Sequence, residues 1–73
     1  MKYKNLEIQK KEKICYVELN RPGSLNALNS ELLIDITNFS NSLSKDLVTR
    51  VVIFTGKGKS FSAGADLKEK VEH

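Results

Sequence analysis

The chain has 73 residues, of which 40% are hydrophobic, and a formal net charge of +3. A domain of this length buries only about 60% of the surface that its unfolded chain exposes, so we expect one small unit, residues 1–73, of marginal stability. Its single cysteine excludes an internal disulfide, and the sequence lacks a His, Cys and carboxylate cluster with metal-ligand spacing, so no metal site is expected.

The N-terminal residues are basic but are not followed by an apolar run, and no stretch approaches the roughly 20 apolar residues of a membrane span. A reducing, cytoplasmic location without a membrane partner is therefore expected. Most of the basic excess lies in the lysines between positions 2 and 13, with Glu7 and Glu12 among them. Because the aromatic residues are not placed for base stacking, we interpret these lysines as a solvated edge and expect no nucleic-acid partner.

The first predicted element is an antiparallel hairpin. Residues 6–9 alternate in hydropathy, and a second apolar segment follows at 14–19 after a charged tetrapeptide. The first strand is expected at the edge of the sheet. In the second strand Cys15, Val17 and Leu19 share one face, so we interpret Cys15 as a small core residue and not as a nucleophile.

An amphipathic helix is predicted after a turn at 21–24 and a loop that continues to Asn29. Asn29 or Ser30 can cap the helix, and Glu31 suits the positive end of the helix dipole. One apolar stripe with helical spacing is expected to face a sheet, and Leu33 to widen it; its members are Leu32, Ile36, Phe39 and Leu43.

A third strand is predicted at 51–55, where the sequence VVIFT is apolar without alternation. Such a run is typical of a central parallel strand that is covered on both faces. A crossover through the helix would make this strand parallel to the second strand of the hairpin. The sequence therefore predicts an α/β fold that begins with a ββαβ unit.

The segment TGKGKS at 55–60 contains the last three residues of a phosphate-binding loop motif. The first glycine of that motif would fall at position 53, which is Ile53, inside the predicted strand. A dinucleotide-binding fingerprint fails as well, because its third glycine would fall at Phe61. We interpret the segment as a flexible basic turn.

The most specific pattern is FSAGADLKE at 61–69. Its small residues allow close approach to the backbone, Gly64 permits unusual dihedral angles, and Asp66 and Glu69 form a capping box that opens a helix. Amides at such a helix start bind negative charge. This helix has room for only about one or two turns before His73, at 3.6 residues per turn, which indicates a fragment of a larger domain.

Two motifs resemble those of the crotonase family, which contains enoyl-CoA hydratases and isomerases. FSAGADL at 61–67 is similar to the family pattern F-x-A-G-A-D-[LI], and LNRPGSLNAL at 19–28 is similar to L-N-R-P-x-x-x-N-A-[LM]. The motifs stand in the family's order, and the resemblance covers roughly residues 5 to 70. It implies a crotonase-like unit of a larger spiral fold, of which the chain would be the N-terminal portion.

The resemblance also implies site residues. In the family, the backbone amide of the residue matching Ala65 is one of two donors to the thioester carbonyl oxygen, which makes Ala65 the expected catalytic position. The acyl-CoA site is expected to be lined by Ala27, Ala63, Asp66 and Leu67. The second donor and the acid/base glutamates lie in later segments of the family, and neither Glu69 nor Glu72 matches them.

The implied function is that of an enzyme acting on an acyl-CoA thioester, with coenzyme A as part of the substrate and no permanently bound cofactor. Hydration of a 2-enoyl-CoA is the first choice of reaction and double-bond isomerisation the second. The family's full-length members form trimers or hexamers. Alternatively, the chain is a non-catalytic fragment that binds coenzyme A weakly or self-associates, and alone it is expected to be inactive. The basic loop at 57–59 could contact coenzyme A phosphates, although a solvated turn is favoured.

Overall fold

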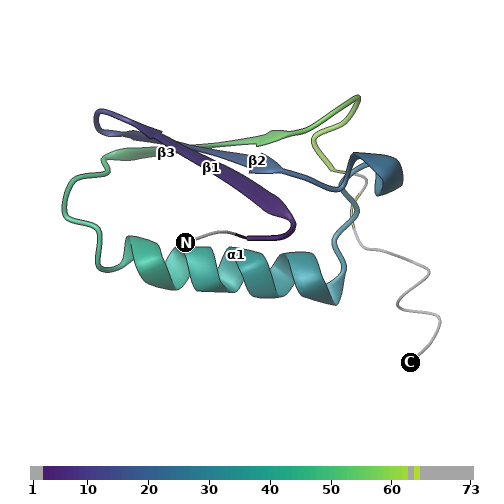
Figure 1. The fold of residues 1–73 in the computed structure, drawn as a ribbon, viewed down its shortest axis with the longest axis horizontal. Coiled ribbons are helices and arrows are strands. Elements are labelled where there is room, and N and C mark those ends of the chain that lie inside the picture. Colours follow the sequence, from purple (N-terminus) through teal and green to yellow (C-terminus); the bar gives the residue numbers. More distant parts are fainter. Residues whose placement is uncertain (1–2, 63, 65–73) are drawn as a thin grey trace.

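The computed structural model describes residues 3–62 and residue 64. Three strands form one sheet in the order β1-β2-β3: β1 is Leu6–Lys11, β2 is Ile14–Leu19 and β3 is Val51–Gly56. The helix α1, Ser30–Leu43, lies along one face of this sheet and makes a second layer (Figure 1). A short 3-10 helix, η1, at Pro22–Ser24 lies between β2 and α1.

The hairpin is confirmed, with β1 two residues longer than predicted. β1 and β2 pair antiparallel from Leu6 opposite Leu19 to Lys11 opposite Ile14. Only Glu12 and Lys13 remain for the connection, and Glu12 takes a left-handed φ of 56° to close it. β1 is an edge strand, as expected.

β3 pairs parallel with β2, which confirms the predicted crossover. Within the described residues, however, β3 is an edge strand and not a central one. Its side chains are correspondingly accessible: Val51 is 49% exposed, Ile53 38% and Phe54 42%. The expectation of cover on both faces is therefore wrong for the described part of the chain. Its one helix leaves the face of Val51 and Ile53 open, and Phe54, although it contacts Phe39 of α1, stays partly exposed on this edge strand.

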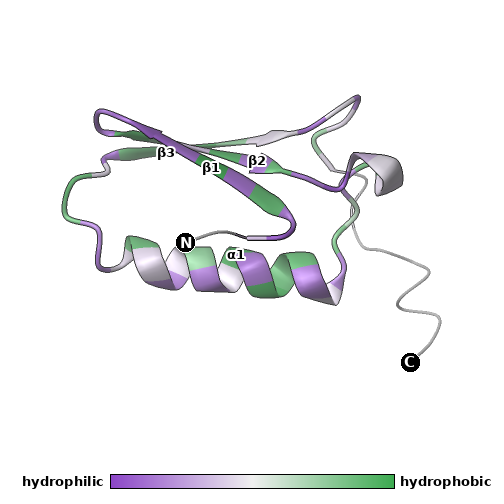
Figure 2. Ribbon diagram, in the orientation of Figure 1, coloured by the Kyte–Doolittle hydropathy of each residue, from purple (hydrophilic) through white to green (hydrophobic). Residues whose placement is uncertain are grey.

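Asn29 is the cap of α1, as the sequence allowed. Its side-chain Oδ1 accepts a hydrogen bond from the amide of Leu32 at 2.9 Å. Figure 2 shows hydrophobic and hydrophilic bands alternating along α1. Leu32 and Phe39 are buried, whereas Leu33 is 48% exposed, so the prediction that Leu33 widens the stripe is wrong. One residue is a rotation of about 100° at 3.6 residues per turn, which carries Leu33 away from the sheet.

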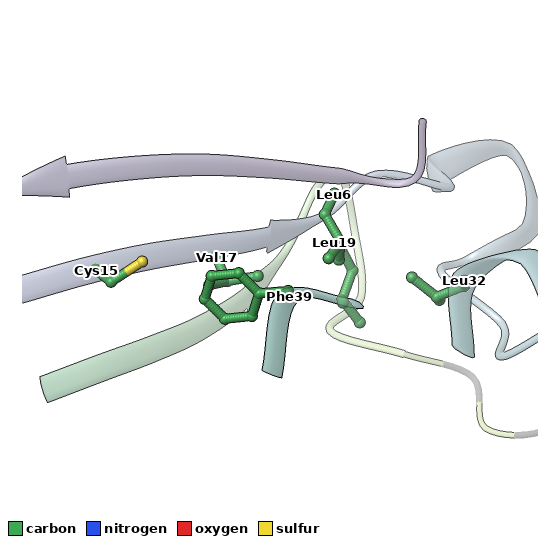
Figure 3. Close-up of a cluster of buried hydrophobic side chains, with 6 residues drawn as sticks. All are labelled: Leu6, Cys15, Val17, Leu19, Leu32 and Phe39. Atoms are coloured by element: carbon green, nitrogen blue, oxygen red, sulfur yellow. The ribbon is translucent and has the colours of Figure 1, made fainter. Parts of the chain in front are cut away.

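The core is a row of apolar side chains between the sheet and α1. Figure 3 shows this row following β2 and ending at Leu32. Its members are Leu6, Cys15, Val17, Leu19, Leu32 and Phe39. The Phe39 ring also makes edge-to-face contacts with Tyr3 and Phe54, at centroid distances of 6.4 and 6.3 Å. Cys15 is a core residue as predicted, and burial raises the pKa of its thiol.

Candidate functional site

The loop that follows β2 contains two consecutive residues with left-handed backbone. Leu25 has φ 50° and Asn26 has φ 55°. Asparagine tolerates this region, but for a residue such as leucine it costs roughly 1–2 kcal/mol. The turn is closed by backbone hydrogen bonds from the Leu25 amide to the Pro22 carbonyl, 3.1 Å, and from the Asn26 amide to the Arg21 carbonyl, 2.8 Å. These bonds help to maintain the unfavourable conformation.

The side chain of Asn26 joins this loop to the loop that follows β3. Asn26 is completely buried. Its Nδ2 donates to the carbonyl oxygens of Lys57 at 2.9 Å and Ser60 at 2.8 Å, and its Oδ1 accepts from the Arg21 amide at 2.7 Å. Both amide hydrogens are therefore used, and the oxygen is satisfied as well. We call this set of three hydrogen bonds the Asn26 clasp.

The second loop folds back sharply where β3 ends. A Cβ atom at Gly56 would overlap the carbonyl oxygens of Ser60 and Phe61, so only glycine fits there. The Lys57 amide donates to the Leu19 carbonyl at 2.9 Å, which continues the pairing of β3 with β2. The predicted turn after β3 is present, and the clasp holds two of its carbonyls; its flexibility stays a prediction.

Ser62 and Gly64 extend the connection towards the second sequence motif. The Ser62 hydroxyl donates to the Asn26 carbonyl at 2.8 Å and accepts from the Gly64 amide at 3.1 Å. The Leu28 amide donates to the Gly64 carbonyl at 2.7 Å. Gly64 has φ 90°, a conformation suited to glycine. The structure thus brings the two motifs together, although they lie more than 30 residues apart in the chain.

Of the predicted site residues, Ala27 is described. It is 9% exposed, and its carbonyl accepts a hydrogen bond from the Arg21 guanidinium. Ala63, Ala65, Asp66 and Leu67 lie outside the described residues, as does the predicted start of a second helix. Their roles stay predictions.

The basic loop is partly engaged with the sheet. The Lys57 ammonium lies 2.5 Å from a carboxylate oxygen of Glu7 on β1. The hydrogen bond to Glu7 raises the pKa of Lys57. This pairing already satisfies part of the positive charge that could otherwise meet a phosphate.

Residues 3–62 and 64 offer no group of three or more His, Cys, Asp and Glu side chains that could hold a metal ion. The same residues contain no helix long and apolar enough to cross a bilayer. The described hydrogen bonds at the joined loops are made by backbone groups and by the side chains of Arg21, Asn26 and Ser62. The sequence did not reveal this role of Asn26, because an asparagine in a loop is ordinarily solvated; the motif LNRPGSLNAL at 19–28 marked its position but not its contacts.

Both loops leave the carboxyl ends of β2 and β3, which run parallel, and Figure 1 shows them at the same end of the molecule. In open α/β sheets, ligands bind outside the carboxyl ends of parallel strands. The fold and the joined loops therefore place the chain in the class of α/β proteins whose ligand site is expected at this end.

Comparison with known proteins gives the particular family. Residues 9–73 match the family model for enoyl-CoA hydratase/isomerase. The chain is 36% identical over 72 residues to a probable enoyl-CoA hydratase of Mycobacterium bovis. The matched region covers 99% of this chain and 28% of that protein. It is 41% identical over 73 residues to a short-chain-enoyl-CoA hydratase of Clostridium acetobutylicum, again 99% of this chain and 28% of the relative.

The crystal structure of an enoyl-CoA hydratase from Bacillus anthracis superposes with a TM-score of 0.91 at 36% identity, over 96% of this chain and 28% of that one. The chain belongs to the enoyl-CoA hydratase/isomerase family, and the predicted crotonase-like unit of hairpin, helix and parallel strand is confirmed. It spans 28% of the length of these relatives.

Proposed function

We propose that this chain forms part of an acyl-CoA thioester site of enoyl-CoA hydratase type. In this proposal the backbone amide of Ala65 is one oxyanion donor, and Ala27, Ala63, Asp66 and Leu67 line the acyl-CoA site. The observation that carries it is the junction of the two loops, in which the Leu28 amide donates to the Gly64 carbonyl at 2.7 Å. That bond places the segment of Ala27 beside the residue that precedes Ala65.

The chemistry follows from the charge that develops during reaction. Removing a proton beside a thioester carbonyl, or adding a nucleophile to its unsaturated neighbour, moves negative charge onto the carbonyl oxygen. A preorganised backbone N–H stabilises this charge as it forms, and loss of one such donor typically costs about 10² to 10³ in rate. Coenzyme A enters as part of the substrate, and no permanently bound cofactor is needed.

Hydration of a 2-enoyl-CoA is the favoured reaction, because the relatives described above are named as hydratases. The proton transfers require an acid and a base, for which this chain has no matching residue. The 73-residue chain is therefore expected to lack turnover by itself. Activity would require the second donor and the acid/base glutamates, which lie in later segments of the family's full-length members, and those members are expected to be homo-oligomers.

The proposal can be tested in a chimeric enzyme, in which residues 1–73 replace the matching 28% of the Clostridium acetobutylicum hydratase. Ala65→Pro removes the amide hydrogen, so kcat on a short 2-enoyl-CoA should fall by about 10² to 10³. Ala65→Ser keeps the amide and is the matched control, with turnover expected within about tenfold of the parent, since one added oxygen is a small change in volume.

Circular dichroism would verify that both variants are folded before kinetics. A folded Ala65→Pro chimera that turns over the thioester near the parent rate would show that residue 65 is not an oxyanion donor.

A further inference from the structure

Asn26 is a buried polar residue whose side chain connects two loops. With no exposed surface, its side-chain amide cannot exchange protein partners for water. Each of its hydrogen bonds is made with a backbone group that lies outside the helices and strands: the Arg21 amide and the carbonyls of Lys57 and Ser60. A buried donor left unsatisfied is costly, so these bonds define the separation of the two loops closely.

The backbone of Asn26 continues the connection. Its carbonyl accepts from the Ser62 hydroxyl, and the same hydroxyl accepts from the Gly64 amide. The Gly64 carbonyl is held from the other side by the Leu28 amide, two residues after Asn26. Both polar backbone groups of Gly64 therefore depend on the segment 26–28.

The orientation of the Gly64 carbonyl also determines the orientation of the amide that follows it. It belongs to the same planar peptide unit as the amide nitrogen of residue 65, and in a trans peptide the C=O and N–H point in opposite directions. The Leu28 amide, by holding this carbonyl, limits rotation of the whole unit about the glycine, the residue type with the widest backbone freedom.

We propose that Asn26 is a positioning residue, which fixes the orientation of the 64–65 peptide unit through the clasp without touching substrate. This inference rests on the proposed function, because it assigns the oriented amide to the thioester oxygen. The left-handed conformation of Leu25 and Asn26 fits this role, since strained backbone is retained where surrounding bonds over-determine it.

The sharpest variant is Asn26→Asp. Aspartate has nearly the same shape and keeps an acceptor for the Arg21 amide, but it has no hydrogens for the carbonyls of Lys57 and Ser60. Asn29→Asp is the matched control, because it makes the same chemical change three residues away. Among the described residues, the hydrogen bond of that side chain is accepted from the Leu32 amide, and aspartate caps a helix as well as asparagine does.

The first measurement uses the 73-residue chain and needs no activity. Amide hydrogen exchange followed by NMR should be at least about tenfold faster for the Leu28 and Gly64 amides in Asn26→Asp than in Asn29→Asp, because these bonds open locally. Amides within α1, such as that of Phe39, should change less than about threefold, which separates loss of the clasp from general unfolding. Unchanged exchange at Leu28 and Gly64 in the folded variant overturns the proposal.

The second measurement uses the chimera described above. Asn26→Asp should lower kcat by about 10², as expected for a misplaced catalytic group, and change KM less than about threefold. A kcat equal to that of Asn29→Asp would refute the positioning role even if Ala65→Pro abolishes turnover. If Ala65→Pro instead retains turnover, the proposed function fails, and the exchange experiment still decides whether Asn26 orders the loop.

Discussion

Two regions of this small unit, the apolar row between the sheet and α1 and the joined loops, are stabilised by different kinds of interaction. Between the sheet and α1, stability comes from a row of apolar side chains, including Val17, Leu32 and Phe39, each at most 2% exposed. At the joined loops, it comes from one buried amide and a few backbone hydrogen bonds. Apolar packing depends mainly on volume and tolerates similar shapes, whereas hydrogen bonds depend on direction and on the identity of donor and acceptor.

This difference between the two regions predicts which kind of substitution should be harmful in each. In the apolar row, a substitution that changes the volume of a buried side chain should be harmful, whereas a substitution at an exposed neighbouring position should not. At the joined loops, an isosteric change that removes a hydrogen can be worse than a change of volume.

Leu32→Ala tests the apolar row and should have the largest effect. Leu32 is wholly buried, and leucine-to-alanine changes at such positions cost about 2–5 kcal/mol. That is a large share of the stability of a domain this small, at roughly 0.05–0.15 kcal/mol per residue. Urea unfolding followed by circular dichroism should show a much lower midpoint, or no cooperative transition.

Leu33→Ala is the control for this prediction, because it removes the same atoms from a neighbouring residue that is 48% exposed. Its effect should stay within about 0.5 kcal/mol, as is usual for surface substitutions. Similar losses from Leu32→Ala and Leu33→Ala would show that the row does not carry the stability assigned to it.

Gly56→Ala tests the joined loops by volume alone. The added methyl would overlap the backbone carbonyls of Ser60 and Phe61, and forced shifts of this kind typically cost about 1–3 kcal/mol. Gly23→Ala is the control, since a Cβ there meets nothing within 4 Å. It should be neutral or stabilising by up to about 1 kcal/mol through the unfolded chain. A folded Gly56→Ala chain as stable as Gly23→Ala would contradict the close return of the loop.

The same contrast explains which features of the fold could be predicted from the sequence. Periodicity predicted the hairpin, the helix from Ser30 and the parallel strand, because alternation and helical spacing report which side chains face an apolar layer. It failed at Leu33 and for the cover of β3, where the outcome depends on which layers surround the element. Family motifs, and not periodicity, indicated the two loops as a site.

The clasp could not be read from the sequence. Asn26 is polar, lies in a loop and takes a left-handed conformation common for asparagine in exposed turns. It is buried where residues 57–62 and Gly64 return onto segment 26–28 in the folded chain. The same holds for the pairing of Lys57 with Glu7, which lie 50 residues apart.

Asp46→Asn tests polar contacts at a third place, the turn between α1 and β3. Its effect on stability should be smaller than those of Leu32→Ala and Gly56→Ala. One carboxylate oxygen accepts from the amides of Val48 and Thr49 at 2.8 and 2.9 Å, and the other accepts from the Thr49 hydroxyl at 2.5 Å and the Lys10 ammonium at 3.0 Å. These contacts, of which the hydrogen bond from the Thr49 hydroxyl has the largest effect, hold the pKa of Asp46 well below its usual range.

Because the folded pKa of Asp46 is depressed, the stabilisation that its carboxylate provides is present above the unfolded pKa of about 3.9. It is lost as the pH falls through the folded pKa. The urea midpoint of Asp46→Asn should therefore lie below that of the parent at pH 7, and the two should converge progressively below about pH 4. Lys10→Met, which removes only the exposed ion-pair partner, should lower the urea midpoint at pH 7 less than Asp46→Asn does. Since Asp46 has four donors but remains partly accessible to water, its replacement should destabilise the chain less than Asn26→Asp does. If instead Asp46→Asn proves the more destabilising of the two, the number of hydrogen bonds and not their burial would govern the polar connections of this fold.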